Sequence, residues 1–246
     1  MTSLTYIAGG SKGLGQALLK LHIQAKHKVF EFSRSGTGPH HIKCNFNDTK
    51  AAQQCFQQAL AITNHTDASE LNQINLVINT ATLAPFGHLA QMEPNSIKQH
   101  ININIESTVA LLHTFIAAYQ QSHALKTITY ISSGAARRDI PGLAMYSASK
   151  AFFERLISTL AEEQNSMNHP FKCMIINPGV MNTDMQAEIR QQNEKDFPML
   201  SWWKELHETG QLADPKDIAN ICYELIHSTG TNGGYYVAQQ LLKSKT

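Results

Sequence analysis

The chain has 246 residues, of which 42% are hydrophobic and 16% are charged, and its formal net charge is +1. This composition is too apolar for a disordered chain, and it lacks the positive charge expected of a protein that binds nucleic acid or an anionic membrane. We also expect no membrane span, because no unbroken apolar run reaches the roughly 18 residues that one needs.

The cysteines and histidines show no recognisable ligand spacing. The four cysteines form no CxxC pair, and the N-terminus lacks the basic start and apolar core of a signal peptide, so we expect a reduced, cytoplasmic protein. The twelve histidines are scattered and include no HExxH motif, so we predict no metal site.

Short β-rich segments alternate along the chain with longer segments of helical periodicity. In chain order the pattern predicts strand 4–8, helix 14–25, strands 29–33 and 42–46, helix 51–62, strand 74–79, helix 93–121, strand 127–132, helix 146–163, strand 172–177, helix 214–227 and strand 235–238. Strands that are apolar on both faces indicate a parallel sheet covered by helices on both sides. We therefore predict an α/β, doubly wound Rossmann fold: one domain over residues 1–246, with seven parallel strands in the order 3-2-1-4-5-6-7.

One long insert, residues 181–212, interrupts this alternation after the sixth strand. It contains Phe197, Pro198, Trp202 and Trp203. An insert at the carboxyl end of a parallel strand lies where such sheets bind ligands, so we predict a helical substrate lid. The alternative is a surface helical hairpin that buries its tryptophans in a small core of its own.

A glycine-rich loop follows the first strand and opens the first helix. Its sequence is Gly9-Gly10-Ser11-Lys12-Gly13-Leu14-Gly15. A pyrophosphate must approach the backbone N–H groups at a helix N-terminus closely, and a Cβ there would obstruct it. Because the loop lies between a strand and a helix, it predicts a nucleotide site, although a plain tight turn could also use these glycines.

The end of the second strand bears on the choice between NAD and NADP. NAD-binding sheets usually end this strand with an acidic residue that holds the adenosine ribose. Here the strand ends in Ser33-Arg34, and Glu31 lies inside it. Arg34 at the strand end and Lys12 in the glycine loop suit a 2′-phosphate, so we predict NADP(H). Two solvated surface cations are the alternative.

A tyrosine and a lysine at helical spacing follow a serine at the end of the fifth strand. Tyr146 and Lys150 share one helix face, and Ser133 precedes Tyr146 by thirteen residues. All three lie at the carboxyl end of the predicted sheet, toward which the nicotinamide of a cofactor on the glycine loop would point.

Six short segments occur in the order found in one enzyme family: residues 8–15, Asn79-Thr80-Ala81, Asn104, residues 131–133, Tyr146-Ser147-Ala148-Ser149-Lys150 and residues 177–183. Together they resemble the short-chain dehydrogenase/reductase family over almost the whole chain. Within the family the sequence is most similar to bacterial benzil reductases and sepiapterin reductases.

The resemblance implies roles for four catalytic residues. Tyr146 would protonate the carbonyl oxygen of the substrate, and Ser133 would hydrogen-bond the same oxygen. Lys150, with the positive ring of the oxidised cofactor, would lower the pKa of Tyr146 from about 10 toward neutrality, and it would hold the nicotinamide ribose. Asn104 would hold a water that relays protons from Lys150, with Asn102 as the competing candidate.

The resemblance also assigns a set of residues to the cofactor. The backbone of Val180 would hold the nicotinamide carboxamide, and Asn45 and Phe46 would flank the adenine. The full set is Gly9, Ser11, Lys12, Gly13, Leu14, Gly15, Ser33, Arg34, Asn45, Phe46, Asn79, Thr80, Ala81, Tyr146, Lys150, Pro178, Gly179, Val180 and Thr183.

Four positions depart from the family pattern. Ala8 replaces a threonine that braces the loop, Asn45 replaces an aspartate, and Thr82 replaces a glycine, which puts the local backbone contacts in doubt. Sepiapterin reductases carry an acidic residue near the position of Gly234. Its absence argues against a pterin substrate, unless Glu188 or another acid of the lid substitutes, because a charge-assisted hydrogen bond is worth about 1.5–3 kcal/mol.

A mostly apolar wall is expected around the polar groups of Ser133 and Tyr146. We predict that it is formed by residues 84–86, Ala135, Leu143, residues 181–185 and residues 202–203, with Phe86, Leu143, Met185 and Trp202 as substrate contacts. An apolar pocket whose polar groups are gathered at one place, at Ser133 and Tyr146, suits an aromatic or alicyclic ketone or diketone.

The sequence therefore predicts an NADPH-dependent carbonyl reductase. One alternative is a 3-oxoacyl thioester reductase, whose acidic carrier would need a basic patch that Arg137 and Arg138 could supply. Another is a non-catalytic NADP sensor, which the presence of both Tyr146 and Lys150 disfavours. Excess apolar residues on helices 107–121 and 147–163 predict a homodimer or homotetramer.

Overall fold

The computed structural model describes residues 3–64 and 71–245. Its strands are β1 (Ser3–Ala8), β2 (Lys28–Ser33), β3 (His41–Lys43), β4 (Gln73–Ile78), β5 (Leu125–Ile131), β6 (Phe171–Asn177) and β7 (Tyr235–Val237). Its α-helices are α1 (Gly13–Gln24), α2 (Thr49–Asn64), α3 (Pro94–Ile101), α4 (Ser107–Tyr119), α5 (Ala144–Gln164), α6 (Asp184–Arg190), α7 (Leu200–Glu208), α8 (Pro215–Glu224) and α9 (Ala238–Lys243). Short 3-10 turns are η2 (Leu89–Gln91) and η4 (Gly134–Arg137), and π turns are η3 (Asn102–Glu106) and η5 (Leu225–Thr229).

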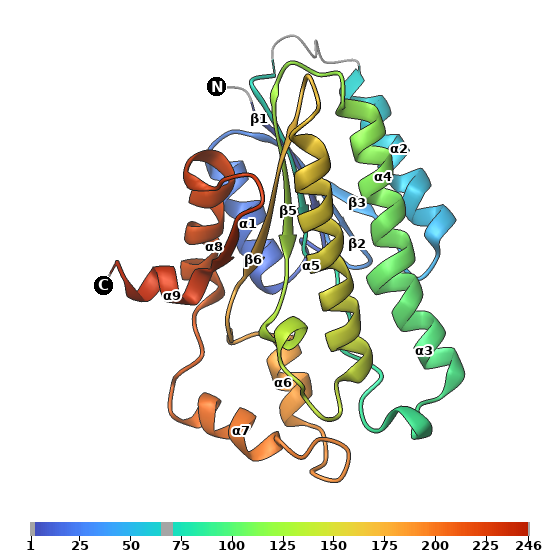
Figure 1. Ribbon diagram of the computed structural model, residues 1–246, viewed down its shortest axis with the longest axis vertical. Helices are drawn as coiled ribbons and strands as arrows, with labels where there is room; N and C mark the ends of the chain where they lie inside the picture. The colour runs from blue at the N-terminus through green and yellow to red at the C-terminus, as the bar shows by residue number, and fades with distance from the viewer. Residues whose placement is uncertain (1–2, 65–70, 246) are drawn as a thin grey trace.

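The strands of the described chain form one parallel sheet. Their order is β3-β2-β1-β4-β5-β6-β7, which confirms the predicted Rossmann topology. Figure 1 shows α2, α4 and α5 on one face of the sheet and α1 and α8 on the other. Parallel pairing brings all the carboxyl ends of the strands to one edge, which we call the carboxyl edge, and all the amino ends to the opposite edge.

Side chains that alternate along β1 belong to two separate cores. Leu4, Tyr6 and Ala8 pack with residues of α2, α4 and α5, whereas Ile7 packs with residues of α1 and α8. The Tyr6 ring is fully buried, and its hydroxyl lies 2.6 Å from the Tyr119 hydroxyl at the end of α4. This pairing satisfies two phenols inside the larger core.

The observed elements differ from the predicted ones mainly at their ends. β3 contains three residues where five were predicted, because its pairing with β2 ends at Lys43. Ala238 begins a short helix, α9, instead of ending the last strand. The Asn-rich segment within residues 93–121 predicts a break in the N-terminal part of that long helix, and the π turn η3 lies there.

The lid insert packs onto the carboxyl edge of the sheet. α6 and α7 share a third core with the start of α5, which contains Leu83, Ala135, Leu143, Tyr146, Ile189, Phe197 and Leu200. Trp203 packs against this core, and its ring centre lies 6.3 Å from that of Phe197. The tryptophans therefore pack toward Tyr146 and do not form a separate hairpin core.

One stretch of the described chain, Pro94–Tyr119, is long and apolar enough to cross a membrane by length and composition. This stretch comprises α3, η3 and α4, and 39% of its most apolar window is buried. Leu111 and Phe115 of α4 pack into the larger core, as a helix that covers a sheet must.

Candidate active site

Two adjoining cavities lie at the carboxyl edge of the sheet. The first, of about 440 Å³, is bordered by the loops that follow β1, β2 and β4, and the second, of about 420 Å³, by the loops that follow β5 and β6 and by the lid. The two cavities adjoin and together form the cleft at this edge, because six residues line both: Asn79, Ala81, Leu83, Met181, Thr183 and Met185. Open α/β sheets bind their ligands at this edge, beside the point where the strand order reverses.

The glycine loop makes close backbone contacts that exclude side chains. Gly9 and Gly13 have φ angles of +84° and +52°, which residues with a side chain rarely adopt. A Cβ on Gly15 would lie 2.1 Å from the Gly9 carbonyl oxygen, which itself accepts a 2.8 Å hydrogen bond from Asn79 Nδ2. The loop and the N-terminus of α1 therefore fit a pyrophosphate, which backbone N–H groups and the helix dipole attract.

The buried carboxylate of Glu31 supports the glycine loop through a hydrogen bond to its backbone. Glu31 is 1% exposed; its Oε1 accepts a 3.1 Å hydrogen bond from the Gly10 N–H, and its Oε2 lies 2.7 Å from Nδ1 of His41. A Cβ on Gly10 would lie 2.3 Å from Glu31 Cγ, so a glycine is needed here to admit the carboxylate. Sequence reasoning had placed Glu31 inside the strand and had missed this supporting contact.

Most of the residues that the sequence assigned to the cofactor line the first cavity. They are Gly9, Ser11, Lys12, Gly13, Leu14, Ser33, Arg34, Asn45, Phe46, Asn79, Thr80, Ala81 and Thr183. The Lys12 ammonium pairs with Asp184 of α6 at 2.8 Å, with both side chains at least 70% exposed. An ion pair this exposed adds little stability, but it links the glycine loop to the lid.

Ser133, Tyr146 and Lys150 converge in the second cavity. Ser133 follows β5, and its Oγ accepts a 3.2 Å hydrogen bond from the Ala135 N–H at the start of η4. Tyr146 and Lys150 lie one turn apart at the start of α5 and are 7% and 4% exposed. The Lys150 ammonium donates to the Ile131 carbonyl at 2.8 Å and lies 5.6 Å from the centre of the Tyr146 ring.

Burial disfavours the charged forms of the tyrosine and the lysine. It raises the pKa of Tyr146 to about 12, and a hydrogen bond with Ser133 acts in the opposite direction. Burial lowers the pKa of Lys150 to about 7, which Glu154 partly offsets. Tyr146 is therefore a protonated phenol at neutral pH, and the protein groups alone do not bring its pKa toward neutrality as the resemblance implied.

Asn104 belongs to a buried hydrogen-bond network at η3. Its Oδ1 accepts from the Thr82 N–H at 2.8 Å, and its Nδ2 donates to the Thr82 carbonyl at 2.9 Å and to Nε2 of His100 at 3.0 Å. His100 Nδ1 donates to the Ala84 carbonyl at 2.7 Å, which leaves Nε2 as the acceptor. The Asn104 amide therefore holds the backbone at Thr82, and His100 positions that amide. No pattern in the sequence pointed to this role of His100.

The loop after β6 carries the backbone groups that the resemblance assigned to the nicotinamide carboxamide. The Val180 N–H donates to Oε1 of Gln239 at 3.2 Å, and the Val180 carbonyl accepts from the Ala213 N–H at 3.0 Å. Gln239 lies on α9, a helix that the sequence did not predict. The side-chain amide of Gln239 therefore already accepts from the Val180 N–H, which is the donor expected to bind the carboxamide of the nicotinamide.

The wall of the second cavity is largely the one predicted. Its apolar lining includes Leu83, Ala135, Ile140, Leu143, Met181, Met185, Ile189, Met199, Trp202 and Trp203. The predicted segment 84–86 is a correction, because none of its residues lines either cavity. Phe86 packs edge-on against Phe197 instead, with ring centres 6.5 Å apart. It supports the lid from outside the cavity.

The two arginines of the predicted basic patch lie in different surroundings. Arg137 donates to Glu154 at 2.7 Å, and its guanidinium stacks on Tyr235 at 3.5 Å. The other carboxylate oxygen of Glu154 accepts from Ser132 Oγ at 2.6 Å. Arg137 is thus held in a structural network, whereas Arg138 lines the second cavity.

Gly234 lies outside the lining of the cleft. A Cβ there would lie 2.5 Å from the ring of Tyr236, so that ring fills the space where an acidic side chain would begin. Three carboxylates of the described residues line the two cavities: Asp139 lines the second, and Asp184 and Glu188 line the first. Burial raises the pKa of Glu188.

Comparisons with known proteins agree with this geometry. Residues 3–194 match the family model of short chain dehydrogenase. The chain is 30% identical over 241 residues to a benzil reductase ((S)-benzoin forming) of Bacillus subtilis, which covers 97% of this chain and 99% of that one. A benzil reductase of Bacillus cereus is 26% identical and covers 90% and 93% of the two chains. The fold superposes on a short chain dehydrogenases/reductase from Saccharomyces cerevisiae with a TM-score of 0.81 and 21% identity over 98% of both chains. The chain therefore belongs to the short-chain dehydrogenase family of oxidoreductases, which use a nicotinamide cofactor.

Proposed function

We propose that the protein is an NADPH-dependent carbonyl reductase that converts an aromatic or alicyclic ketone or diketone into the hydroxy compound. The observation that carries this proposal is the convergence of Ser133, Tyr146 and Lys150 in a cavity that adjoins the glycine-loop cavity. Two relatives from Bacillus are benzil reductases, which supports the substrate class. We further propose that residues 1–246 act as one domain, with residues 181–212 as its substrate lid.

The side chains of the second cavity suit proton donation to a carbonyl oxygen. When bound, the nicotinamide supplies the hydride for the carbonyl carbon. The Tyr146 hydroxyl donates its proton to the carbonyl oxygen, so ketone, hydride and proton together make the alcohol. Ser133 donates a hydrogen bond to the same oxygen and stabilises the negative charge that develops there. The Lys150 ammonium lies beside Tyr146 and stabilises the phenolate that remains.

The surroundings of the β2 end support NADP(H) over NAD(H). Ser33 and the exposed Arg34 line the first cavity, and a guanidinium can hold a 2′-phosphate through two hydrogen bonds. Glu31, a carboxylate of β2, is held beneath Gly10 and away from the strand end. Lys12 is paired with Asp184, so we assign the larger share of the discrimination to Arg34.

The two alternatives have less support. A thioester reductase needs a basic surface for an acidic carrier, and Arg137 is already committed to Glu154 and Tyr235. A non-catalytic sensor does not need a buried tyrosine beside a buried lysine. Burial of the polar groups of Tyr146 and Lys150 costs free energy, which argues for a catalytic role.

The reaction and the role of Tyr146 are tested together. NADPH oxidation is followed by absorbance with benzil, 1-phenyl-1,2-propanedione, sepiapterin and an acetoacetyl thioester. We expect the diketones to react fastest, and we expect Tyr146→Phe to lower kcat by about 10²- to 10⁴-fold, the usual contribution of a general acid. Tyr223→Phe on α8 is the matched control and keeps the wild-type rate. A Tyr146→Phe protein with full activity contradicts the mechanism, and a preference for the thioester supports the first alternative.

Arg34→Ala tests the cofactor preference. Loss of two charge-assisted hydrogen bonds to the 2′-phosphate should weaken NADPH binding about 10- to 100-fold, and NADH binding should not change. Binding is measured by fluorescence titration of both cofactors, with Lys20→Ala on α1 as a control that removes an exposed cation elsewhere. Equal losses for NADPH and NADH would show that Arg34 does not read the phosphate.

Gln239→Ala tests whether the chain's own amide competes with the cofactor. Removing the Gln239 side chain frees the Val180 N–H, so NADPH should bind about 2- to 10-fold more tightly, the value of one hydrogen bond. Gln240→Ala on the same helix is the control. Weaker binding of NADPH by Gln239→Ala would mean that this amide helps to build the site.

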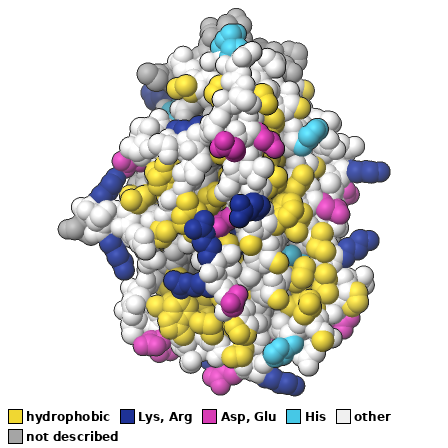
Figure 2. All heavy atoms as spheres, viewed as in Figure 1, with side chains coloured by type: hydrophobic (Ala, Val, Ile, Leu, Met, Phe, Trp, Pro, Cys, Tyr) yellow, Lys and Arg dark blue, Asp and Glu magenta, His cyan; other side chains and the backbone are white. Residues whose placement is uncertain are grey.

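We propose a cytoplasmic homodimer or homotetramer that pairs through α4 and α5. The four cysteines are free, as in a reducing compartment. Apolar side chains gather over these two helices in Figure 2, and Phe152 of α5 is 43% exposed.

Light scattering should give at least a dimer, and Phe152→Glu should give a monomer, because assembly would bury the new charge. Leu125→Glu, an equally apolar but distant site, should leave the assembly intact; a monomeric wild type refutes the proposal.

A further inference from the structure

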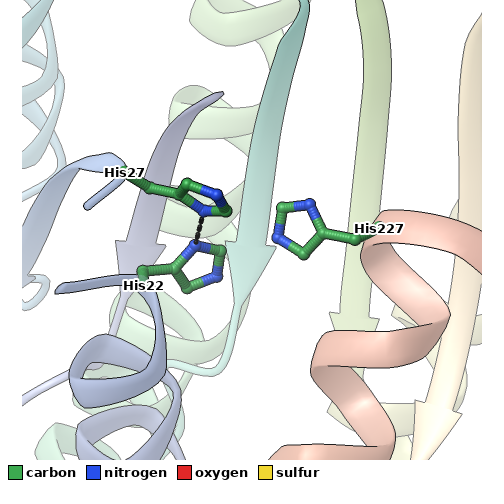
Figure 3. A group of neighbouring side chains, drawn as sticks. All are labelled: His22, His27 and His227. Atoms are coloured by element: carbon green, nitrogen blue, oxygen red, sulfur yellow. Dashed lines mark hydrogen bonds between the residues drawn. The ribbon is translucent and has the colours of Figure 1, made fainter. Parts of the chain in front are cut away.

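Three histidines meet at the amino edge of the sheet, opposite the catalytic cleft. His22 lies on α1, His27 in the turn between α1 and β2, and His227 on η5 (Figure 3). Within residues 3–64 and 71–245, one ring nitrogen from each lies within 4.8 Å of those from the other two. None of these three residues lines either cavity, so the cluster is separate from the proposed active site.

The end of α1 holds two of the imidazoles side by side. The His27 N–H donates to the His22 carbonyl at 2.9 Å, and the Lys26 N–H donates to the Ile23 carbonyl at 2.9 Å. Lys26, between them, has a φ of +57°. This is the Schellman motif, in which the residue after the left-handed one contacts the third residue from the helix end. Two histidines take the positions of the usual hydrophobic contact, and their Nδ1 atoms lie 3.2 Å apart.

The third imidazole is oriented by a glutamine of β4. Gln73 Nε2 donates to the Ile226 carbonyl at 3.1 Å, so its Oε1 faces His227 and accepts from Nδ1 at 2.8 Å. His227 Nε2 then carries the free lone pair, and it is buried without a hydrogen-bond partner. Figure 3 shows this ring pointing toward the other two. A partner that fixes one ring nitrogen of a histidine and leaves the other free is typical of metal ligands.

The spacing of these nitrogens suits a small tetrahedral ion. Ligand nitrogens about 2.0–2.1 Å from Zn²⁺ lie about 3.3 Å from one another, close to the separation of the His22 and His27 Nδ1 atoms. Without an ion, one of these two Nδ1 atoms donates a hydrogen bond to the other, so binding of the ion would release that proton. We propose that His22, His27 and His227 form a binding site for a divalent transition-metal ion of the Zn²⁺ type, with water as a fourth ligand.

A positive charge near the cluster opposes the ion. Lys172 of β6 donates to the Ile226 carbonyl at 3.4 Å, and it adds to the effect of burial and of His27 in lowering the pKa of His227. Burial lowers the pKa of all three histidines, so the imidazoles are neutral near pH 7, as metal ligands must be. The Tyr223 ring is stacked with His27 and tilted against His227, with ring centres 6.0 and 4.3 Å apart.

The test is a metal titration of the full chain, prepared without a polyhistidine tag and stripped with a chelator. Zn²⁺ is titrated in competition with a chromophoric chelator, and the melting temperature is measured with and without Zn²⁺. We expect one Zn²⁺ per chain and a higher melting temperature, because binding to the folded state stabilises it. Mg²⁺, which prefers oxygen ligands, should do neither. Co²⁺ in the same site should give the strong visible absorption of tetrahedral coordination.

Variants separate ligation from packing. His27 is partly exposed, so His27→Ala should fold as judged by circular dichroism, yet bind Zn²⁺ more than about 100-fold more weakly. Gln73→Leu should weaken binding about 10- to 100-fold, since it removes the group that orients a ligand. Lys172→Met should strengthen binding.

His123→Ala removes a histidine from an exposed pair with His169, whose ring centres lie 4.3 Å apart, and should change nothing. Equal binding by wild type and folded His27→Ala, or no binding by wild type, overturns the proposal. The cluster would then be a packed set of uncharged aromatic rings.

Discussion

Parallel pairing of the strands is the constraint on which the catalytic cleft depends. Because every strand runs in the same direction, the residues that follow β1, β4, β5 and β6 meet at one edge although they are far apart in the sequence. Gly9, Asn79, Ser133 and Gly179 each follow a different strand and all border the cleft. Each loop then supplies one kind of group: backbone donors, an amide, a hydroxyl or a sharp turn.

Lys150 is buried in the cleft, and burying its ammonium group costs free energy unless nearby groups stabilise the charge. Desolvation disfavours the Lys150 ammonium, and three features offset it: the Ile131 carbonyl, the face of the Tyr130 ring and the nearby charge of Glu154. Glu154 is in turn held by Arg137, whose side chain is 55% exposed. Charges of alternating sign therefore run from Arg137 at the protein surface through Glu154 to Lys150 in the second cavity.

The sequence was sufficient to predict the strand order and most of the cleft, because those features repeat short patterns of hydrophobicity and glycine. The residues that it missed act through contacts with segments far away in the chain. Glu31, His100 and Gln239 make such contacts, and the sequence around each of them contains no motif that indicates its role. Phe86 was assigned to the cavity from its position in the chain, but its ring direction depends on the packing of the lid against Phe197.

The same argument explains why the sequence did not predict the cluster of three histidines. His22 and His27 are adjacent only because the helix ends in a Schellman motif, and His227 joins them only because α8 packs against α1.

Helix α1 connects this cluster to the catalytic cleft. It begins at Gly13, in the loop that borders the first cavity, and it ends beside His27, so its twelve residues span about 18 Å between the two places. An ion at its C-terminal end would link α1 to η5 and to Gln73 of β4, and it would reduce the freedom of the helix that carries the glycine loop. It would contact none of the reacting atoms. An effect of the ion on the enzyme should therefore reside in stability and in cofactor affinity, and not in the proton transfer at Tyr146.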